Sequence, residues 1–162
     1  MELQIKVKAE LANIGLILNS VEKAVADLGN QHFLKSDLLV VVEEVVVNIV
    51  KYANASFLNI HIKSCSNWVC VIIEDDGKPF DVTLLNKKPD ISSPIKDRKA
   101  GGLGLFFASE LSDEFHYVRQ RGINRWEIKN SFKSHKIHYL CDSSFNFRIP
   151  PHNWLWGTKD RR

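Results

Sequence analysis

The chain has 162 residues, of which 44% are hydrophobic and 25% are charged, and its formal net charge is +3. This length fits one domain with a full core, no apolar run is long enough to span a membrane, and the N-terminus is not a signal peptide. The three cysteines have no metal-binding spacing, which indicates a reducing, cytoplasmic location. The excess of basic residues lies in 133–162, too dispersed to predict nucleic-acid binding.

The first predicted elements are a strand and a helix. Residues 2–9 alternate apolar and polar side chains, which indicates a strand with one buried face. Residues 11–28 carry apolar side chains at helical spacing, and Gly29 follows where a helix commonly ends.

A second helix is predicted at residues 38–52, because this aliphatic run is too long for a typical strand. Ser36 is the expected N-cap, with Asp37 in the first turn near the positive end of the helix dipole. Helical spacing places Glu44, Asn48 and Lys51 on one face. The opposite, core-packing face is expected to contain Leu38, Val42, Val45, Ile49 and Tyr52.

The polar groups of this helix have two interpretations. Buried polar groups are costly unless they are satisfied, so carboxylates, an amide and a lysine within an aliphatic run suggest that a ligand or metal meets the helix. The same residues equally fit the solvated polar stripe of an ordinary amphipathic helix.

Two strands are predicted at residues 57–63 and 68–74, and the second ends in an acidic turn. Asp75 lies where its carboxylate could accept a hydrogen bond from a donor such as an exocyclic amine. Gly77 would let the backbone come close to a flat ligand. The alternative is an ordinary turn, since Asp-Gly is a common turn dipeptide.

Residues 82–99 are polar, basic and rich in turn formers, as expected of a loop that closes over phosphates, although an ordinary surface loop would have the same composition. Gly101, Gly102 and Gly104 then open a predicted helix at 103–111. A glycine-rich turn at a helix N-terminus exposes backbone N–H groups, which suits a phosphate. The pattern is neither a Walker A loop nor a dinucleotide fingerprint, and alone it does not identify a site.

The last predicted pair of strands, at 114–120 and 124–130, forms a hairpin that turns at Arg121 and Gly122. Together the elements predict an α+β fold, a two-layer α/β sandwich with helices on one face of a mixed, largely antiparallel sheet. Residues 133–162 follow this sandwich. They could cover a sheet edge, form a dimer contact, dock a partner, or be a non-native terminus from a disrupted reading frame.

Three of these segments, in their order and spacing, resemble the N, G1 and G2 boxes of the GHKL (Bergerat) ATP-binding fold. Residues 48–52 resemble the second half of a histidine-kinase N box, although Glu44 stands where a histidine kinase usually has asparagine. With Asp-x-Gly-x-Pro-Phe-Asp at 75–81 and Gly-Gly-Leu-Gly-Leu at 101–105, the chain is similar to the anti-sigma-factor serine/threonine kinases of bacterial partner-switching systems. The resemblance covers about residues 1–132 and leaves 133–162 as an extension of unknown role.

The resemblance implies a role for each matching polar residue of the first box. Glu44 falls on the catalytic base, which would orient or deprotonate the attacking serine hydroxyl. Asn48 falls on the residue that holds Mg²⁺, and one such ligand is sufficient because magnesium keeps waters and phosphate oxygens for its other positions. Lys51 matches a phosphate-contacting lysine.

The other two boxes imply the contacts to the nucleotide itself. Asp75 matches the aspartate that reads the adenine amino group, and Gly77 packs against the base. Gly102 and Gly104 match glycines that meet the phosphates. The expected nucleotide-binding set also includes the neighbouring Pro79, Gly101, Leu103 and Leu105.

The implied function is that of a serine protein kinase and anti-sigma factor that depends on ATP and Mg²⁺. It would phosphorylate a small antagonist protein, hold a sigma factor in its other state, and act as a cytoplasmic homodimer away from the membrane. Two alternatives are a non-catalytic ATP- or ADP-binding regulatory module and a pure interaction protein whose boxes have decayed.

Overall fold

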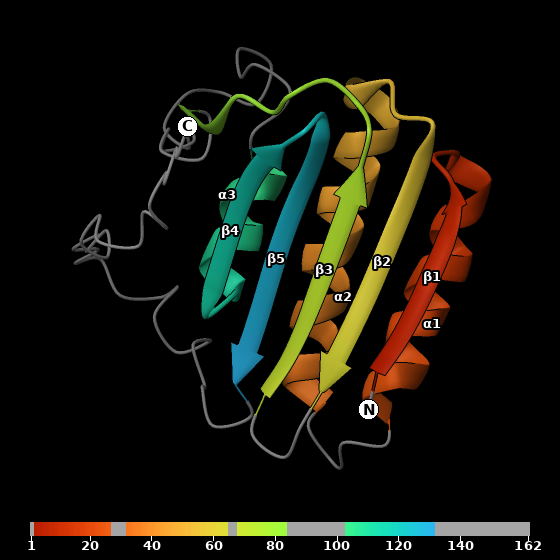
Figure 1. Ribbon diagram of the computed structural model, residues 1–162. Helices are drawn as coiled ribbons and strands as arrows, with labels where there is room; N and C mark the ends of the chain where they lie inside the picture. The colour runs from red at the N-terminus through yellow and green to blue at the C-terminus, as the bar shows by residue number, and fades with distance from the viewer. Residues whose placement is uncertain (1, 27–31, 65–67, 84–102, 132–162) are drawn as a thin grey trace, which may run out of the picture.

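The structure is a computed structural model that describes residues 2–26, 32–64, 68–83 and 103–131. Its elements, in chain order, are β1 (Glu2–Lys8), a short 3-10 turn (Leu11–Asn13), α1 (Ile14–Ala26), α2 (His32–Asn48), a π-helical turn (Ile49–Ala53), β2 (Phe57–Ser64), β3 (Trp68–Asp75), α3 (Leu103–Leu111), β4 (Glu114–Gln120) and β5 (Ile123–Ser131). The strands form one five-stranded sheet in the order β1-β2-β3-β5-β4, and every neighbouring pair is antiparallel. The three described α-helices all cover the same face of this sheet (Figure 1), which confirms the predicted two-layer sandwich.

The helix α2 lies between α1 and α3 and supplies much of the core (Figure 1). Its side chains at Leu38, Val41, Val42, Val45 and Val46 are all 0% exposed. Valine disfavours a helix by at most about 0.7 kcal/mol, whereas burying its side chain contributes about 1.5–3 kcal/mol. Burial against the sheet therefore decides that this valine-rich run is helical.

Two details predicted for this helix are wrong. Ser36 is not the N-cap, because α2 begins at His32; Ser36 is exposed, and an exposed serine is tolerated inside a helix. Tyr52 does not pack in the core but is 69% exposed. The cause is the π-helical turn after Asn48, whose wider winding rotates the following residues away from the positions that α-helical spacing predicts.

The predicted hairpin between β4 and β5 is confirmed. Arg121 has φ 51° and Gly122 has φ 84°, and positive φ at both central residues is the geometry of a type I′ turn, which matches the twist of the flanking strands. Among the described helices, none is long and apolar enough to cross a membrane. Gly29, residues 84–99 of the predicted loop at 82–99, and the extension at 133–162 lie outside the described residues, so their predictions stay predictions.

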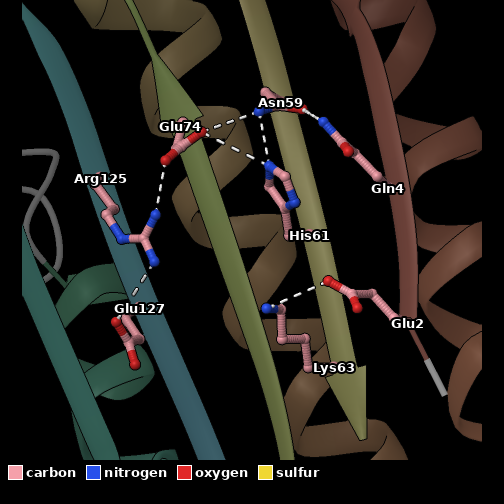
Figure 2. Close-up of polar contacts among 8 residues, drawn as sticks. All are labelled: Glu2, Gln4, Asn59, His61, Lys63, Glu74, Arg125 and Glu127. Carbon is pink, nitrogen blue, oxygen red and sulfur yellow. Dashed lines mark hydrogen bonds and ion pairs between the residues drawn. The ribbon is translucent and has the colours of Figure 1, made fainter.

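The sheet face opposite the helices carries a network of polar side chains that crosses four strands (Figure 2). Arg125 of β5 donates to the Glu74 carboxylate of β3 at 2.7 Å, and Asn59 of β2 donates to the same carboxylate at 2.9 Å. Lys63 and Glu2 form an ion pair between β2 and β1 at 3.2 Å. These contacts join neighbouring strands on the uncovered side of the sheet.

Candidate functional site

The most unusual polar group in the described chain is the carboxylate of Asp75, at the end of β3. Its side chain is fully buried, at 0% exposure. Oδ1 accepts hydrogen bonds from the backbone N–H of Gly77 and from Nδ2 of Asn124, both at 2.8 Å. Oδ2 is also buried but has no hydrogen-bond partner among the described residues. A buried acceptor without a donor is costly, so this oxygen is a candidate contact for a ligand.

The charge of Asp75 is also affected by its position. Burial raises the pKa of the carboxyl group, and the hydrogen bonds from Asn124 and Gly77 act in the opposite direction. The nearby Asp76 raises the same pKa and Arg119 lowers it. An ionised Asp75 therefore gains from any further donor that reaches Oδ2.

Gly77 lies in close contact with the end of the helix layer. A Cβ at this position would come within 2.7 Å of both the Cβ and the carbonyl oxygen of Ala53, and within 2.8 Å of Asp75 Oδ1. The next residue, Lys78, donates its backbone N–H to the Ala53 carbonyl at 2.7 Å. The sequence predicts that the backbone at Gly77 comes close to a flat ligand. In this structure the backbone at Gly77 comes close to Ala53. Contact of Gly77 with a flat ligand stays a prediction.

Three residues that sequence reasoning missed hold the segment after Asp75 in place. Asn124 of β5 donates to the carbonyl of Lys78 at 3.0 Å as well as to Asp75. Arg119 of β4 donates to the carbonyl of Gly77 at 2.8 Å, and the hydroxyl of Tyr117 accepts the backbone N–H of Phe80 at 2.9 Å. The sequence does mark Asn124 as unusual, because it is a polar residue at an inward-facing position of β5, where Trp126 and Ile128 are apolar. A buried polar side chain needs hydrogen-bond partners.

Asp76, next to Asp75, has a structural role. Its exposed carboxylate accepts hydrogen bonds from the backbone N–H of Ser56 at 2.7 Å and from the Ser56 hydroxyl at 2.5 Å. The hydrogen bond from the Ser56 hydroxyl lowers the pKa of Asp76. The two neighbouring aspartates are therefore different: Asp76 ties the end of β3 to the start of β2, and Asp75 keeps an unused acceptor.

Glu44 and Gly104 meet where α2 packs against α3. A Cβ added to Gly104 would collide with the Glu44 carboxylate. Glycine at this position thus leaves room for the carboxylate beside the first turn of α3. The Glu44 segment and Gly104 of the predicted glycine-rich turn therefore lie side by side, while Gly101 and Gly102 of that turn lie outside the described residues.

Asn48 is the last residue of α2, directly before the π-helical turn. It is half-buried, and its Nδ2 donates to the backbone carbonyl of Glu44 at 2.6 Å. This bond involves the amide nitrogen of Asn48. The amide oxygen, the atom that binds hard cations such as Mg²⁺, takes no part in it. Lys51 is exposed in the π-helical turn, and such turns are frequent at functional sites.

The candidate residues follow one another along α2 and the π-helical turn that continues it. Gly77 contacts Ala53 at the C-terminal end, Asn48 lies between, and Glu44 meets Gly104 about two and a half turns before Ala53. Within the described ranges, no group of three or more histidine, cysteine and acidic side chains could hold a metal ion. A cation at Asn48 would therefore need its other ligands from a bound molecule or water.

The remaining predicted residues are placed as follows. Pro79 is exposed in the segment after β3. Leu105 is 5% exposed and belongs to the hydrophobic core, and Leu103 begins α3. Gly101 and Gly102 lie outside the described residues.

Comparison with known proteins finds relatives of this chain. The serine-protein kinase RsbW of Staphylococcus aureus strain MSSA476 is 26% identical over 129 residues, which cover 75% of this chain and 81% of that protein. RsbW of strain USA300 gives the same identity and coverage. A crystal structure of the RsbU and RsbW domains of Rv1364c from Mycobacterium tuberculosis matches with a TM-score of 0.57 at 16% identity, covering 80% of this chain and 32% of that one, which shows a shared fold.

The family match defines the class of domain. The family described as histidine kinase-like ATPase domain matches residues 7–126, a range that contains the Asp75, Asn48 and Glu44 positions. The resemblance to the GHKL fold is thereby confirmed. The match extends over more than half of the chain, and the protein belongs to the family of histidine kinase-like ATPase domains.

Proposed function

We propose that this protein binds ATP with Mg²⁺ along α2 and transfers the γ-phosphate to a serine of a small partner protein. The observation that carries the proposal is the unpartnered, buried Oδ2 of Asp75. An acceptor in this position favours a base with an exocyclic amine, as adenine has. A base with a carbonyl oxygen at that point would bring two acceptors together.

The phosphate end of the nucleotide would lie toward Glu44 and Gly104. Glu44 is half-buried beside the first turn of α3, where backbone N–H groups and the positive end of the helix dipole favour anions. Phosphoryl transfer depends mainly on positioning and on neutralising charge. In this arrangement Glu44 orients the attacking serine hydroxyl and accepts its proton, as a general base does.

The residues present fit a magnesium ion that is shared with the phosphates. Asn48 offers an amide oxygen on the same helix, between the base end and Glu44. Asn48 would hold the ion, whose positive charge would offset the negative charge of the phosphates. Lys51 and the predicted glycine contacts at Gly101 and Gly102 belong to the same proposed site.

The partners are proposed from the family resemblance and from the relatives named serine-protein kinase RsbW. The substrate would be a small antagonist protein, and the other state of the chain would hold a sigma factor. We propose a homodimer, with residues 1–132 as the kinase domain and 133–162 as an extension.

Replacing Asn48 with alanine is expected to weaken the binding of ATP in the presence of Mg²⁺ by about tenfold or more, which corresponds to ~1.4 kcal/mol. Isothermal titration with ATP, with and without EDTA, measures this effect. Asn19→Ala, a change of an exposed asparagine on α1, is the control and should bind as wild type does. Unchanged Mg²⁺-dependent affinity in Asn48→Ala would reject the metal role. No heat for the wild type would reject the nucleotide site itself.

Replacing Gly104 with alanine is expected to slow phosphoryl transfer by about tenfold or more while the melting temperature stays unchanged or rises slightly. The added methyl group pushes the mobile end of Glu44 aside, whereas alanine favours a helix over glycine by about 1 kcal/mol. Gly15→Ala on α1 is the matched control, because a Cβ there meets nothing within 4 Å. A fully active Gly104→Ala variant would contradict the proposed placement of Glu44.

A second function is favoured by one observation. The Glu44 carboxylate is packed against α3 at Gly104, so this residue could be structural and the chain a nucleotide-controlled binding module. Radiolabelled ATP with an added antagonist protein separates the two. Label on the antagonist indicates a kinase, while ATP binding without transfer indicates the module.

A further inference from the structure

Three side chains from β4 and β5, here called the Asn124 cluster, meet behind Asp75: Tyr117, Arg119 and Asn124. The oxygen of the Asn124 amide accepts two hydrogen bonds, one from the Tyr117 hydroxyl at 2.7 Å and one from the Arg119 guanidinium at 2.5 Å. Its nitrogen donates to Asp75 Oδ1 and to the carbonyls of Gly77 and Lys78, at 2.8, 3.3 and 3.0 Å. The residue is 2% exposed, so no solvent competes for these bonds.

This arrangement allows the Asn124 amide only one orientation. A flipped amide would place its oxygen against the Asp75 carboxylate and the carbonyls of Gly77 and Lys78, all of which are acceptors, and its nitrogen against the donors from Arg119 and Tyr117. An unmade or repulsive contact in a buried network costs more than a normal hydrogen bond contributes. The nitrogen end therefore always faces Asp75.

The fixed amide in turn determines what Asp75 can offer. Oδ1 is occupied by two donors, the Asn124 amide and the Gly77 backbone N–H. Oδ2 alone is left as an acceptor among the described residues. We infer that Tyr117, Arg119 and Asn124 are positioning residues for the nucleobase, which fix the oxygen of Asp75 that faces the exocyclic amine. This inference rests on the proposed function, since it assigns the cluster to the same site.

The cluster also holds the chain that follows Asp75. The Tyr117 hydroxyl accepts from the Phe80 backbone N–H, and Arg119 donates to the Gly77 carbonyl. The Tyr117 ring additionally packs against Phe80 and Trp126, with ring centroids 5.7 and 4.7 Å apart. The hydroxyl and the ring of Tyr117 thus have separable roles, in polar positioning and in packing.

The ion pair between Glu74 and Arg125, on the opposite face of the sheet, offers a control for changes to the Asn124 cluster. Asp75 pairs with Asn124, and the adjoining rung pairs Glu74 with Arg125. The ion pair between Glu74 and Arg125 joins the same two strands on the uncovered face (Figure 2), whereas Asp75, the next residue of β3, points to the opposite, buried face. Breaking it removes a contact between β3 and β5 that involves none of the hydrogen-bond partners of Asp75.

The test compares the binding of ATP with that of inosine triphosphate, which carries a carbonyl oxygen where ATP has its exocyclic amine. Tyr117→Phe keeps the ring and removes the hydroxyl, and Asn124→Ala removes the amide. By isothermal titration, Tyr117→Phe is expected to weaken ATP binding by about two- to tenfold and Asn124→Ala by about tenfold or more, with little change for inosine triphosphate. Arg125→Gln should leave both affinities as in the wild type.

The ratio of the two affinities decides the inference. A fall in the preference for ATP in Tyr117→Phe and Asn124→Ala, but not in Arg125→Gln, supports it. Equal losses for both nucleotides, or an unchanged preference, would overturn it even though the protein binds ATP. Should Asn124→Ala fail to fold, Tyr117→Phe carries the test alone. A wild-type protein that binds neither nucleotide would instead refute the proposed function.

Discussion

Replacing Glu44 with glutamine is expected to reduce phosphoryl transfer by about 10²- to 10⁴-fold, the usual contribution of a general base. Glutamine keeps the size of the side chain, so its contact with Gly104 at the α2–α3 junction is preserved. It cannot accept the proton of the serine hydroxyl. The affinity for ATP should therefore stay within a few fold of wild type, and only the chemical step should slow.

The measurement is single-turnover transfer of labelled phosphate from saturating ATP to a serine-bearing antagonist protein. Glu43→Gln is the matched control, because Glu43 is the preceding residue of the same helix and is exposed. It should transfer phosphate at the wild-type rate. Full activity in Glu44→Gln, with the same affinity for ATP, would show that the base is another group.

Replacing Asp75 with asparagine is expected to weaken ATP binding by about 10- to 100-fold, the range for a lost hydrogen bond to a charged group. The donors at Gly77 and Asn124 should keep the oxygen of the new amide at the Oδ1 position. Its NH₂ group then replaces Oδ2 and faces the amine of the base, so that two donors meet. Isothermal titration measures the loss.

The stability of the same variant separates a binding effect from a folding effect. Burial raises the pKa of Asp75 above its unfolded value, so the ionised group disfavours the fold, and this contribution makes stability fall as pH rises through the raised pKa. Asparagine has no charge and should remove this dependence. We expect a variant without nucleotide that is at least as stable as the wild type near neutral pH. A strongly destabilised Asp75→Asn protein would show that the carboxylate is mainly structural.

Much of the fold could be predicted because the periodic patterns are strong. Residues of β5 alternate in burial along the whole strand, and the positive φ at Arg121 and Gly122 is the geometry that a two-residue hairpin needs. The helical state of the valine-rich α2 could also be predicted from its length. Its beginning could not, because Ser36 carries the local preference of an N-cap while the helix extends past it to His32.

The candidate site could be predicted only in part. That the Glu44, Asp75 and Gly104 segments belong to one site was implied by their resemblance to the three boxes, and the structure shows Glu44 beside Gly104 and Gly77 beside Ala53. The π-helical turn has no simple signal in a single sequence, and it changes where Tyr52 points. The role of Asn124 depends on β5 pairing with β3, a contact between residues far apart in the chain that no local pattern encodes.

The polar network on the uncovered side of the sheet limits which kind of molecule could bind that face. The carboxylates of Figure 2 already have partners: Glu74 meets Arg125 and Asn59 from adjacent strands, Glu2 meets Lys63 of β2, and Glu127 meets Arg125 of its own strand. The charged groups of this surface are hydrated. Covering them with apolar side chains would remove that hydration without providing new hydrogen bonds, which costs free energy. A molecule that binds this face of the sheet must therefore supply hydrogen-bonding groups to these side chains.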